Sequence, residues 1–335
     1  MTVLLVLVIV FALAFDYING FHDTANAIAT VVSTRVLSPL AAILMAGVLN
    51  FVGALIAKKV AGTIASEIVS QQYATESVVL AAILGAIVWN IITWRYGIPS
   101  SSSHALIGGL IGAAVVREFE TGPGIVKWSG IFMKVIVPLV ASPIAGLLIG
   151  YAIMKAITST FAHWHPKGVG TAFKRLQLVS SALMAVSHGQ NDAQKSMGVI
   201  TLALMAHKLV PYSAKPAIPL WVVMSCATVM GLGTAAGGWR IIRTMGHRII
   251  RLEPVNGFAA ETSGAAVILT ASHYGLPVST THCIAGSIFG VGAAKRLSAV
   301  RWQVAINMVV AWIVTIPAAA IVAGVAYALM SFFQR

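Results

Sequence analysis

The chain has 335 residues, of which 58% are hydrophobic and only 9% are charged. Soluble domains usually carry about 25% charged residues, so a water-soluble globular class is excluded. A formal net charge of +13 would suggest nucleic acid as a partner of a soluble protein. Here the bases cluster in short loops between apolar segments, a pattern that reports membrane topology, and we expect no nucleic-acid partner.

Uncharged stretches long enough to cross a hydrocarbon core of about 30 Å define the expected membrane segments. The first begins at Met1 and lacks the basic start and cleavage site of a signal peptide, so we expect it to be retained. The others are Val36–Ala57, Tyr96–Val116, Val135–Met154, Pro216–Trp239, and the longer stretches Thr262–Ala294 and Trp302–Gln334, which each have room for more than one crossing or a re-entrant piece.

The polar stretch 157–175 separates a first half, residues 1–156, from a second half, residues 176–335, and two motifs recur in both halves in the same order. Gly20–Asn26 aligns with Gly189–Lys195 at an offset of 169, and Gly97–His104 aligns with Gly275–His282 at an offset of 178. Duplicated halves with an odd number of crossings enter the membrane in opposite senses. The predicted fold is an all-α polytopic membrane protein of two inverted-topology repeats with broken helices or re-entrant hairpins.

Assigning Ser77–Trp94 and Pro99–Val116 as crossings gives about five crossings per half, although Pro99–Val116 and its counterpart are alternatively re-entrant hairpins. Thirteen lysines and arginines then fall on the side of the 157–175 connection, where Glu253 is the one nearby acid. Six bases and four glutamates fall on the other side. The positive-inside rule therefore predicts a cytoplasmic connection with both termini outside.

Two aspartates occupy aligned positions in apolar surroundings, where a charge costs several kcal/mol. Asn26 lies three residues after Asp23, and Asn191 lies directly before Asp192. Each motif also contains a glycine, Gly20 or Gly189, at which we expect the helix to break. Freed N–H groups suit an anion, whereas freed carbonyls and carboxylates suit a cation, so one motif supplies ligands for both.

Each half also contains a run of hydroxyl residues shortly after a proline. A proline followed by small hydroxyl residues favours a helix start at which N–H and hydroxyl donors converge, which makes a neutral cradle for an anion. The alternative is that these segments only permit close helix packing. The candidate anion ligands are Ser101, Ser102, Ser103, Ser279, Thr280 and Thr281.

The remaining polar residues in apolar segments are few. We expect His104 and His282 to orient the hydroxyl runs, the alternatives being donation to an anion or proton shuttling. Glu261 is a candidate to bind a cation or relay a proton, and the aligned positions 78–83 contain no carboxylate. The chain has no G-x-x-x-x-G-K-[ST] motif, so we do not expect an ATP-driven pump. It has no nucleophile with a paired base and orienting acid, so we do not expect an enzyme, and we expect no cofactor.

At these motifs the chain resembles the inorganic phosphate transporter (Pit) family. The matching runs are Asn19–Ala27, Ser187–Asp192 and Leu276–His282, and the likeness covers essentially the whole chain. The resemblance implies symport of phosphate with sodium or protons by alternating access, in a homodimer within the lipid bilayer. It places Asp23, Asn26, Asn191 and Asp192 in the ion and phosphate centre, with the six hydroxyls contacting phosphate.

Two residues depart from the pattern Asn-Asp-x-x-Asn that sodium-coupled members show in both repeats. His22 stands in place of the first asparagine, and Lys195 in place of the last one of the second repeat. The departures resemble the bacterial low-affinity branch of the cell (inner) membrane, which takes up phosphate with protons, often as a neutral metal–phosphate complex. Asp23 and Asp192 would then face the cation, and His22, Lys195 and Glu261 would take part in coupling. A sodium-coupled phosphate or sulfate carrier and an anion channel are the alternatives.

Overall fold

The computed structural model describes residues 2–56 and 58–334, so Met1, Arg335 and Ala57, the expected end of the second membrane segment, lie outside the described residues. Helices joined by short connections make up nearly all of the described ranges, and one isolated β-bridge pairs Val69 with Val126. The all-α class predicted from the sequence is confirmed.

The first half contains α1 (Val3–Ser33), α2 (Pro39–Ile56), α3 (Lys59–Glu67), α4 (Glu76–Tyr96), α5 (Ser102–Thr121), α6 (Trp128–Ile131), the π-helical turn η1 (Phe132–Ile136) and α7 (Val137–Thr160). The second contains α8 (Pro166–Ala206), α9 (Leu220–Ala236), α10 (Trp239–Arg243), the π-helical turn η2 (Thr244–Arg248), α11 (Pro254–His273), α12 (Thr280–Lys295), the 3₁₀ turn η3 (Leu297–Ala299) and α13 (Trp302–Gln334).

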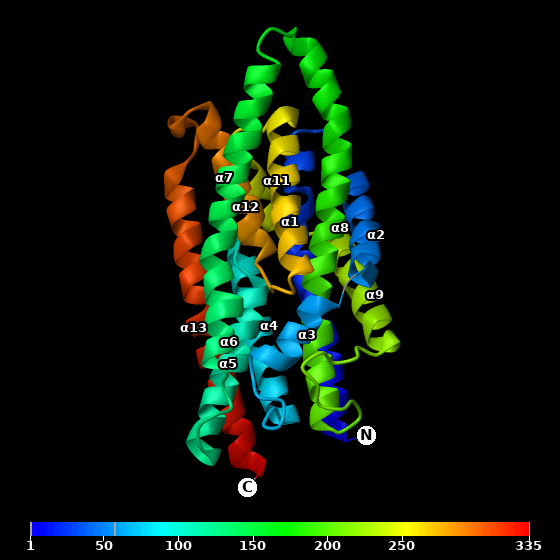
Figure 1. Cartoon of the computed structure of the whole chain (residues 1–335), viewed down its shortest axis with the longest axis vertical. Helices are drawn as coiled ribbons and strands as arrows, with labels where there is room; N and C mark the ends of the chain where they lie inside the picture. Colours follow the sequence, from blue (N-terminus) through cyan, green and yellow to red (C-terminus); the bar gives the residue numbers. More distant parts are fainter. Residues whose placement is uncertain (1, 57, 335) are drawn as a thin grey trace.

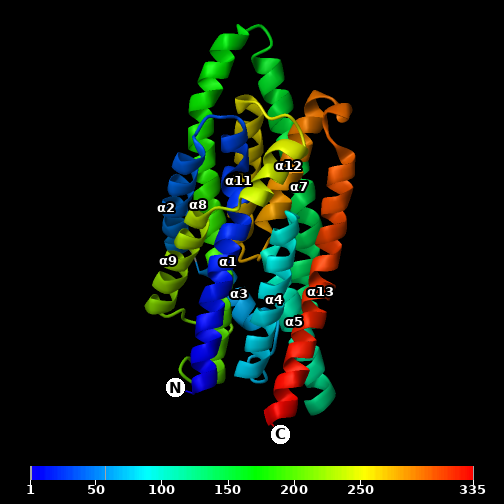
Figure 2. The ribbon, with the colours of Figure 1, turned by 180° about the vertical axis from the view of Figure 1, so that it is seen from behind.

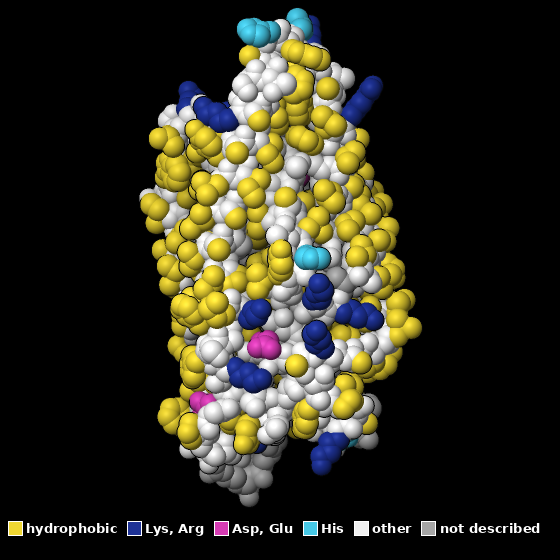
Figure 3. All heavy atoms as spheres, viewed as in Figure 1, with side chains coloured by type: hydrophobic (Ala, Val, Ile, Leu, Met, Phe, Trp, Pro, Cys, Tyr) yellow, Lys and Arg dark blue, Asp and Glu magenta, His cyan; other side chains and the backbone are white. Residues whose placement is uncertain are grey.

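Five of the described helical segments are long and apolar enough to cross a membrane, and the pair α9 with α10–η2, bent by 59°, makes a sixth. The five are α1, α2, α4, α13 and the continuous segment Trp128–Thr160. Hydrophobic side chains cover much of the face in Figure 3, as expected for a surface in contact with lipid.

The long helices run along the long axis of the molecule (Figure 1). Both marked chain ends lie at one end of this axis, here called the terminal end, and the turn between α7 and α8 lies at the other, here called the connection end. The two termini thus lie on the same side, as expected from the sequence.

Two helical hairpins enter the bundle from opposite ends (Figures 1 and 2). α4 and α5 rise from the terminal end and turn near the middle, whereas α11 and α12 descend from the connection end and turn near the middle. The crossing Pro99–Val116 considered from the sequence is therefore wrong, because α5 returns to the end from which α4 came. The alternative, a re-entrant hairpin, is the arrangement that the structure has.

The turn of each hairpin is held by a short helical segment of the other half. Thr63 of α3 donates its hydroxyl to the carbonyl of Gly275 (2.7 Å), and Thr244 of η2 donates to the carbonyl of Gly97 (3.0 Å). Both glycines have positive φ, 70° and 64°, which a glycine adopts without strain. The backbone conformation that ends α4 and α11 thus exposes a carbonyl to the same kind of donor in both halves.

The expected helix breaks at Gly20 and Gly189 are wrong, because α1 and α8 are continuous through these residues. A Cβ at Gly20 would lie 2.8 Å from the carbonyl oxygen of Met230 on α9. At Gly189 it would lie 2.2 Å from the carbonyl oxygen of Asn50 on α2. These glycines therefore serve close approach between helices, the other common use of glycine in a membrane bundle.

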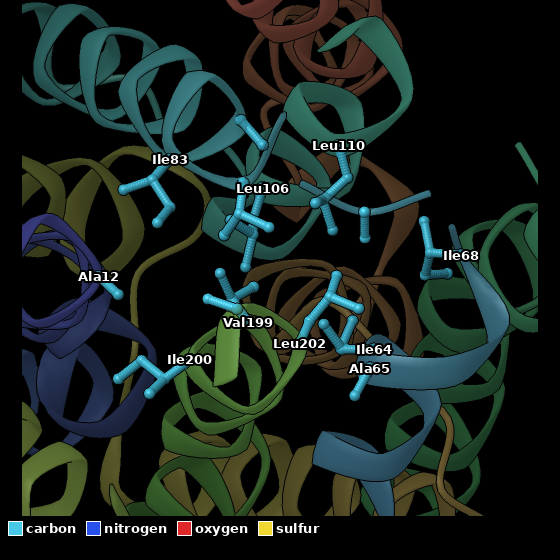
Figure 4. Packing of buried hydrophobic residues seen from close by; sticks show 14 of the residues in the cluster. Ala12, Ile64, Ala65, Ile68, Ile83, Leu106, Leu110, Val199, Ile200 and Leu202 are labelled. Atoms are coloured by element: carbon cyan, nitrogen blue, oxygen red, sulfur yellow. The ribbon is translucent and has the colours of Figure 1, made fainter. Parts of the chain in front are cut away.

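An apolar cluster fills the bundle between the hairpin α4–α5 and helices α1, α3 and α8 (Figure 4). It includes Ala12, Ile64, Ile83, Leu106 and Val199, each no more than 1% exposed. We call this group the apolar plug. It lies on the terminal side of the residues described next, and dense packing of this kind excludes water.

Candidate functional site

Helices α5 and α12 both begin at the hydroxyl runs, as the sequence predicts. The Ser101 side chain accepts the backbone N–H of His104, and the Ser279 side chain accepts that of His282, each at 3.2 Å. Serine is a favourable residue at this position because its oxygen serves one of the four unpaired N–H groups of the first turn. The hydroxyl hydrogens of both serines remain available to a ligand.

The two helix starts meet in the middle of the molecule. Ser103 donates its hydroxyl to the carbonyl of Val278 (3.3 Å), and the rings of His104 and His282 lie 4.9 Å apart. The His282 ring also stacks on Trp312 at 3.9 Å, while the ring nitrogens of both histidines have no hydrogen-bond partner among the described residues. These ring contacts support the prediction that the histidines orient the hairpins.

Helix α1 brings Asn26 and Asp23 to these helix starts. The Asn26 amide donates to the hydroxyl oxygens of Thr280 (3.1 Å) and Thr281 (2.9 Å). Asp23 lies 2.6 Å from the Nδ1 atom of His22. The α1 motif of the first half thus contacts the hydroxyl run of the second half.

His22 connects the same point to the hairpin α4–α5. Its Nε2 atom is 3.1 Å from the hydroxyl of Thr93, and the Ser102 hydroxyl is 3.5 Å from its Nδ1 atom. His22 is fully buried. Its Nδ1 atom thus contacts both Asp23 and the first hydroxyl run.

Helix α8 contributes Asp192, which has three partners. Its carboxylate lies 2.5 Å from the Lys195 ammonium and 3.3 Å from the His188 Nε2 atom, and it accepts the Thr280 hydroxyl at 3.3 Å. Lys195 donates in addition to the Ser103 hydroxyl. The ammonium thus lies between the carboxylate of the second half and the hydroxyl run of the first.

Asn191 is the predicted ligand that points elsewhere. Its amide donates to the hydroxyl of Ser272 (2.8 Å) and to the carbonyl of Leu276 (3.4 Å), so it ties α8 to the hairpin α11–α12. Its carbonyl oxygen has no partner among the described residues. We call Asp23, Asn26, Asp192, Lys195 and the hydroxyls of residues 101–103 and 279–281 the central site.

The side chains of the central site are all buried, the most exposed being Asp23 at 3%. Water is therefore excluded, and charges in such surroundings interact more strongly than they do at a surface. A ligand can reach these side chains only if the hairpins or helices around them move.

A cation could be held by Asp23, His188 and Asp192, whose ligand atoms all lie within 4.8 Å of one another. Two carboxylates and one imidazole are a donor set that suits a divalent transition metal, and the carboxylates alone suit a harder cation. His188 was not among the site residues expected from the sequence. Its place four residues before Asp192, on the same helix face, was the available signal.

Glu261 lies outside the central site. Its carboxylate accepts hydrogen bonds from Gln177 (3.1 Å), Thr30 and Ser180. Thr30 is seven residues from Asp23 on α1, which corresponds to about 10 Å along the helix toward the connection end. The carboxylate is thus a separate, fully buried group on the connection side of the central site.

A basic cavity of about 450 Å³ lies over the turn of α11–α12. Its lining includes Lys58, Lys59, Lys134 and Lys215, with Gly275 of the turn. Lysines and arginines gather on the lower part of the face in Figure 3. Such a cavity attracts anions to one of the two hairpins.

A membrane bundle in which two hydroxyl-capped helix starts meet buried carboxylates and an ammonium is the architecture of an anion transporter. The chain belongs to the phosphate transporter family, whose family model matches residues 19–323. The membership predicted from the sequence motifs is confirmed.

Named relatives and a solved structure agree with this assignment. A probable low-affinity inorganic phosphate transporter of Bacillus subtilis (strain 168) is 47% identical over 98% of each chain. One of Rhizobium meliloti (strain 1021) is 46% identical over 97% of this chain and 96% of its own. The solved structure titled "The sodium-dependent phosphate transporter" superimposes with a TM-score of 0.91 at 25% identity, over 99% of this chain and 100% of that one.

Proposed function

We propose that this protein is a secondary active symporter that imports inorganic phosphate together with protons, by alternating access about two inverted repeats. In this proposal it lies in the cell (inner) membrane with the turn between α7 and α8 in the cytoplasm and both termini outside. The loop distribution of lysine and arginine supports that orientation even without Arg95, which the re-entrant hairpin α4–α5 removes from the connection side. The family resemblance further supports a homodimer.

The observation that carries proton coupling is the position of Lys195. Its ammonium is 1% exposed and lies 2.5 Å from the Asp192 carboxylate. A fixed positive charge there neutralises the carboxylate as a bound sodium ion would, and it repels a second cation nearby. The cation requirement of this half of the site is thereby met by the chain itself.

Protons are then the ions that the remaining groups are suited to carry. His22 has an imidazole, a side chain that can bind and release a proton. It is bonded to Asp23 on one side and to Thr93 on the other. Glu261, with its three hydrogen-bond donors, is a second group for the proton on the connection side.

Phosphate binding is assigned to the two hydroxyl runs and to Asn26. The hydroxyls of Ser102, Ser103, Thr280 and Thr281 already meet the Asn26 amide, the Lys195 ammonium or His22. Phosphate would take over these donors when the site opens. We further propose that a divalent metal enters with phosphate as a neutral complex, which the Lys195 ammonium does not repel as it repels a free cation. The metal would face Asp23 and Asp192, and this pairing avoids repulsion between the carboxylates and the anion.

The alternative is sodium coupling, which two observations favour. The solved structure of similar fold is titled a sodium-dependent transporter. The cluster of Asp23, His188 and Asp192 also leaves a cation position that does not involve Lys195 directly. A sulfate substrate would fit the same neutral hydroxyl donors.

The test is uptake of labelled phosphate into proteoliposomes on which proton and sodium gradients are imposed independently. We expect an inward proton gradient to drive accumulation without sodium, and a sodium gradient alone to drive none. Adding a divalent metal to metal-free buffer should raise the rate if the complex is the substrate. Strict dependence on sodium, with no response to the pH gradient, would refute proton coupling and favour the alternative.

A further inference from the structure

A stripe of polar residues runs along α1 and extends well beyond the central site. Asp16, Asn19, Asp23, Asn26 and Thr30 follow one another at spacings of three, four, three and four residues, so they share one helix face. Each is at most 3% exposed. Asp16 lies about 10 Å from Asp23 toward the terminal end, opposite to Glu261 on the connection side.

Asp16 is poorly supplied with hydrogen-bond donors for a buried acid. The Ser196 hydroxyl of α8 donates to its Oδ1 atom at 2.8 Å, and its Oδ2 atom has no partner among the described residues. A carboxylate has about four acceptor positions, so the Ser196 hydroxyl and the weakly donating Cys226 thiol leave most of them unserved. Burying an anion in this way costs several kcal/mol, whereas a carboxyl that holds a proton avoids that cost.

Two amides continue the stripe from Asp16 to the central site. The Asn19 and Asn90 side chains are fully buried, and neither has a partner for its oxygen or its nitrogen among the described residues. α1 and α4 run in the same direction side by side (Figure 2), and His22 meets Thr93 across them. Asn19 lies three residues before His22 on α1, and Asn90 lies three residues before Thr93 on α4. The two amides therefore lie at the same level, about one helical turn closer to Asp16.

The charged and titratable groups around Asp16 come from two neighbouring helices and from α1 itself. Asp192 and Lys195 face it from α8, and the Cys226 thiol faces it from α9. Asn90 of α4 is neutral. His22 and Asp23 lie on the next turns of α1.

We propose that Asp16 is the proton-binding residue on the terminal side of the central site, and that it exchanges its proton with that site along Asn19 and Asn90. A proton from the terminal end binds the Asp16 carboxylate to give the neutral carboxyl. The same proton then passes to the His22 imidazole, the proton-carrying group proposed above, and this transfer restores the Asp16 carboxylate, so no other reactant is consumed. This role deepens the proton coupling proposed above and rests on it.

The test combines infrared difference spectroscopy with uptake, on lipid-reconstituted wild type, Asp16→Asn and Asp16→Glu. Adding inorganic phosphate at constant pH should change a carboxyl C=O stretching band in the wild type. That band should vanish in Asp16→Asn and be shifted in Asp16→Glu. Uptake driven by a proton gradient should fall at least about tenfold in Asp16→Asn and recover in part in Asp16→Glu.

Ser196→Ala provides a second variant that keeps the carboxyl and removes its donor. We expect it to move the pH dependence of uptake toward higher pH, because the lost donor served the anion. A spectrum of Asp16→Asn that equals the wild-type spectrum, or an unchanged response of that variant to the proton gradient, would overturn the role of Asp16. If the band behaves as expected but wild-type uptake ignores the proton gradient, the proposed coupling fails while proton binding at Asp16 stands.

Discussion

The two sides of the central site differ in what separates it from solvent. On the connection side, Glu261 is bonded to Thr30 and Gln177, and Gln177 accepts the hydroxyl of Thr34 (2.9 Å), which is only part-buried at the end of α1. On the terminal side, the apolar plug fills the corresponding space (Figure 4). Hydrogen bonds therefore run from Glu261 to Thr34 on the connection side, whereas on the terminal side packed hydrocarbon lies beside the polar stripe of α1 that includes Asp16.

The same contrast appears when aligned residues of the two halves are compared. By the offsets of the sequence motifs, Ile83 and Val199 align with Glu261 and Thr30. Glu261 and Thr30 share a hydrogen bond, whereas Ile83 and Val199 both belong to the apolar plug. The halves are alike where hairpins turn and helices begin, and they differ where an ion would be handled. We infer that phosphate binding uses both halves and that coupling on the connection side depends on the second.

The largest effect is expected at the central site, on which both sides converge. Asp23→Asn and Asp192→Asn should each lower phosphate uptake at least about tenfold with expression retained, because each removes a charge from a buried group with specific partners. Uptake into proteoliposomes, normalised to reconstituted protein, measures this. Near-normal uptake in both variants would show that transport does not require these aspartates.

The next prediction compares aligned positions directly. Glu261→Gln keeps the size of the side chain but can neither ionise nor release a proton, so proton-driven uptake should fall about tenfold. Ile83→Val, at the aligned position of the plug, should lower the free energy of unfolding by about 1 kcal/mol and leave the response to the proton gradient unchanged. Equal effects of the two substitutions on proton-driven uptake would contradict the view that Glu261 takes part in coupling and the aligned Ile83 does not.

A smaller effect is expected from the hydroxyl runs. Ser102→Ala and Thr280→Ala should each raise the KM for phosphate about tenfold, since a hydrogen bond to a charged group contributes about 1.5 to 3 kcal/mol. Ser159→Ala, on an exposed turn at the end of α7, is the control. An unchanged KM in the double variant would mean that the runs only allow close packing.

The smallest effect is expected at the hairpin turns, where the halves are alike. Thr63→Val and Thr244→Val each remove one hydroxyl donor to a turn carbonyl at nearly constant volume, a loss of about 1 kcal/mol. We expect modest changes in uptake rate, of similar size for the two variants, measured at saturating phosphate. A large effect of one and none of the other would show that one turn alone controls access.

The sequence predicted the central site better than it predicted the helices around it. Repeated motifs selected Asp23, Asp192 and both hydroxyl runs, and the structure brings these side chains together, while their roles in transport stay predictions. The breaks expected at Gly20 and Gly189 were wrong, since a glycine in an apolar helix serves close packing as readily as a break, and only the neighbouring helix decides.

Asp16 and His188 were missed for a related reason. Asp16 aligns with the apolar Ala185, and His188 aligns with Asn19, which has an amide where the second half has an imidazole. Repetition between the halves identifies only the residues that the halves share. Burial and missing hydrogen-bond partners, which identify Asp16, are properties of the packed bundle.

The central claim is that the Lys195 ammonium supplies the positive charge that sodium would otherwise bring to Asp192. Its most direct test is the sodium dependence of phosphate uptake in Lys195→Asn proteoliposomes, with Lys167→Asn, an exposed change at the start of the same helix, as control. We expect wild type and control to transport without sodium, and Lys195→Asn to be impaired in its absence and partly restored by sodium. Wild-type uptake that requires sodium, or a Lys195→Asn variant that transports without sodium as the wild type does, would contradict the account.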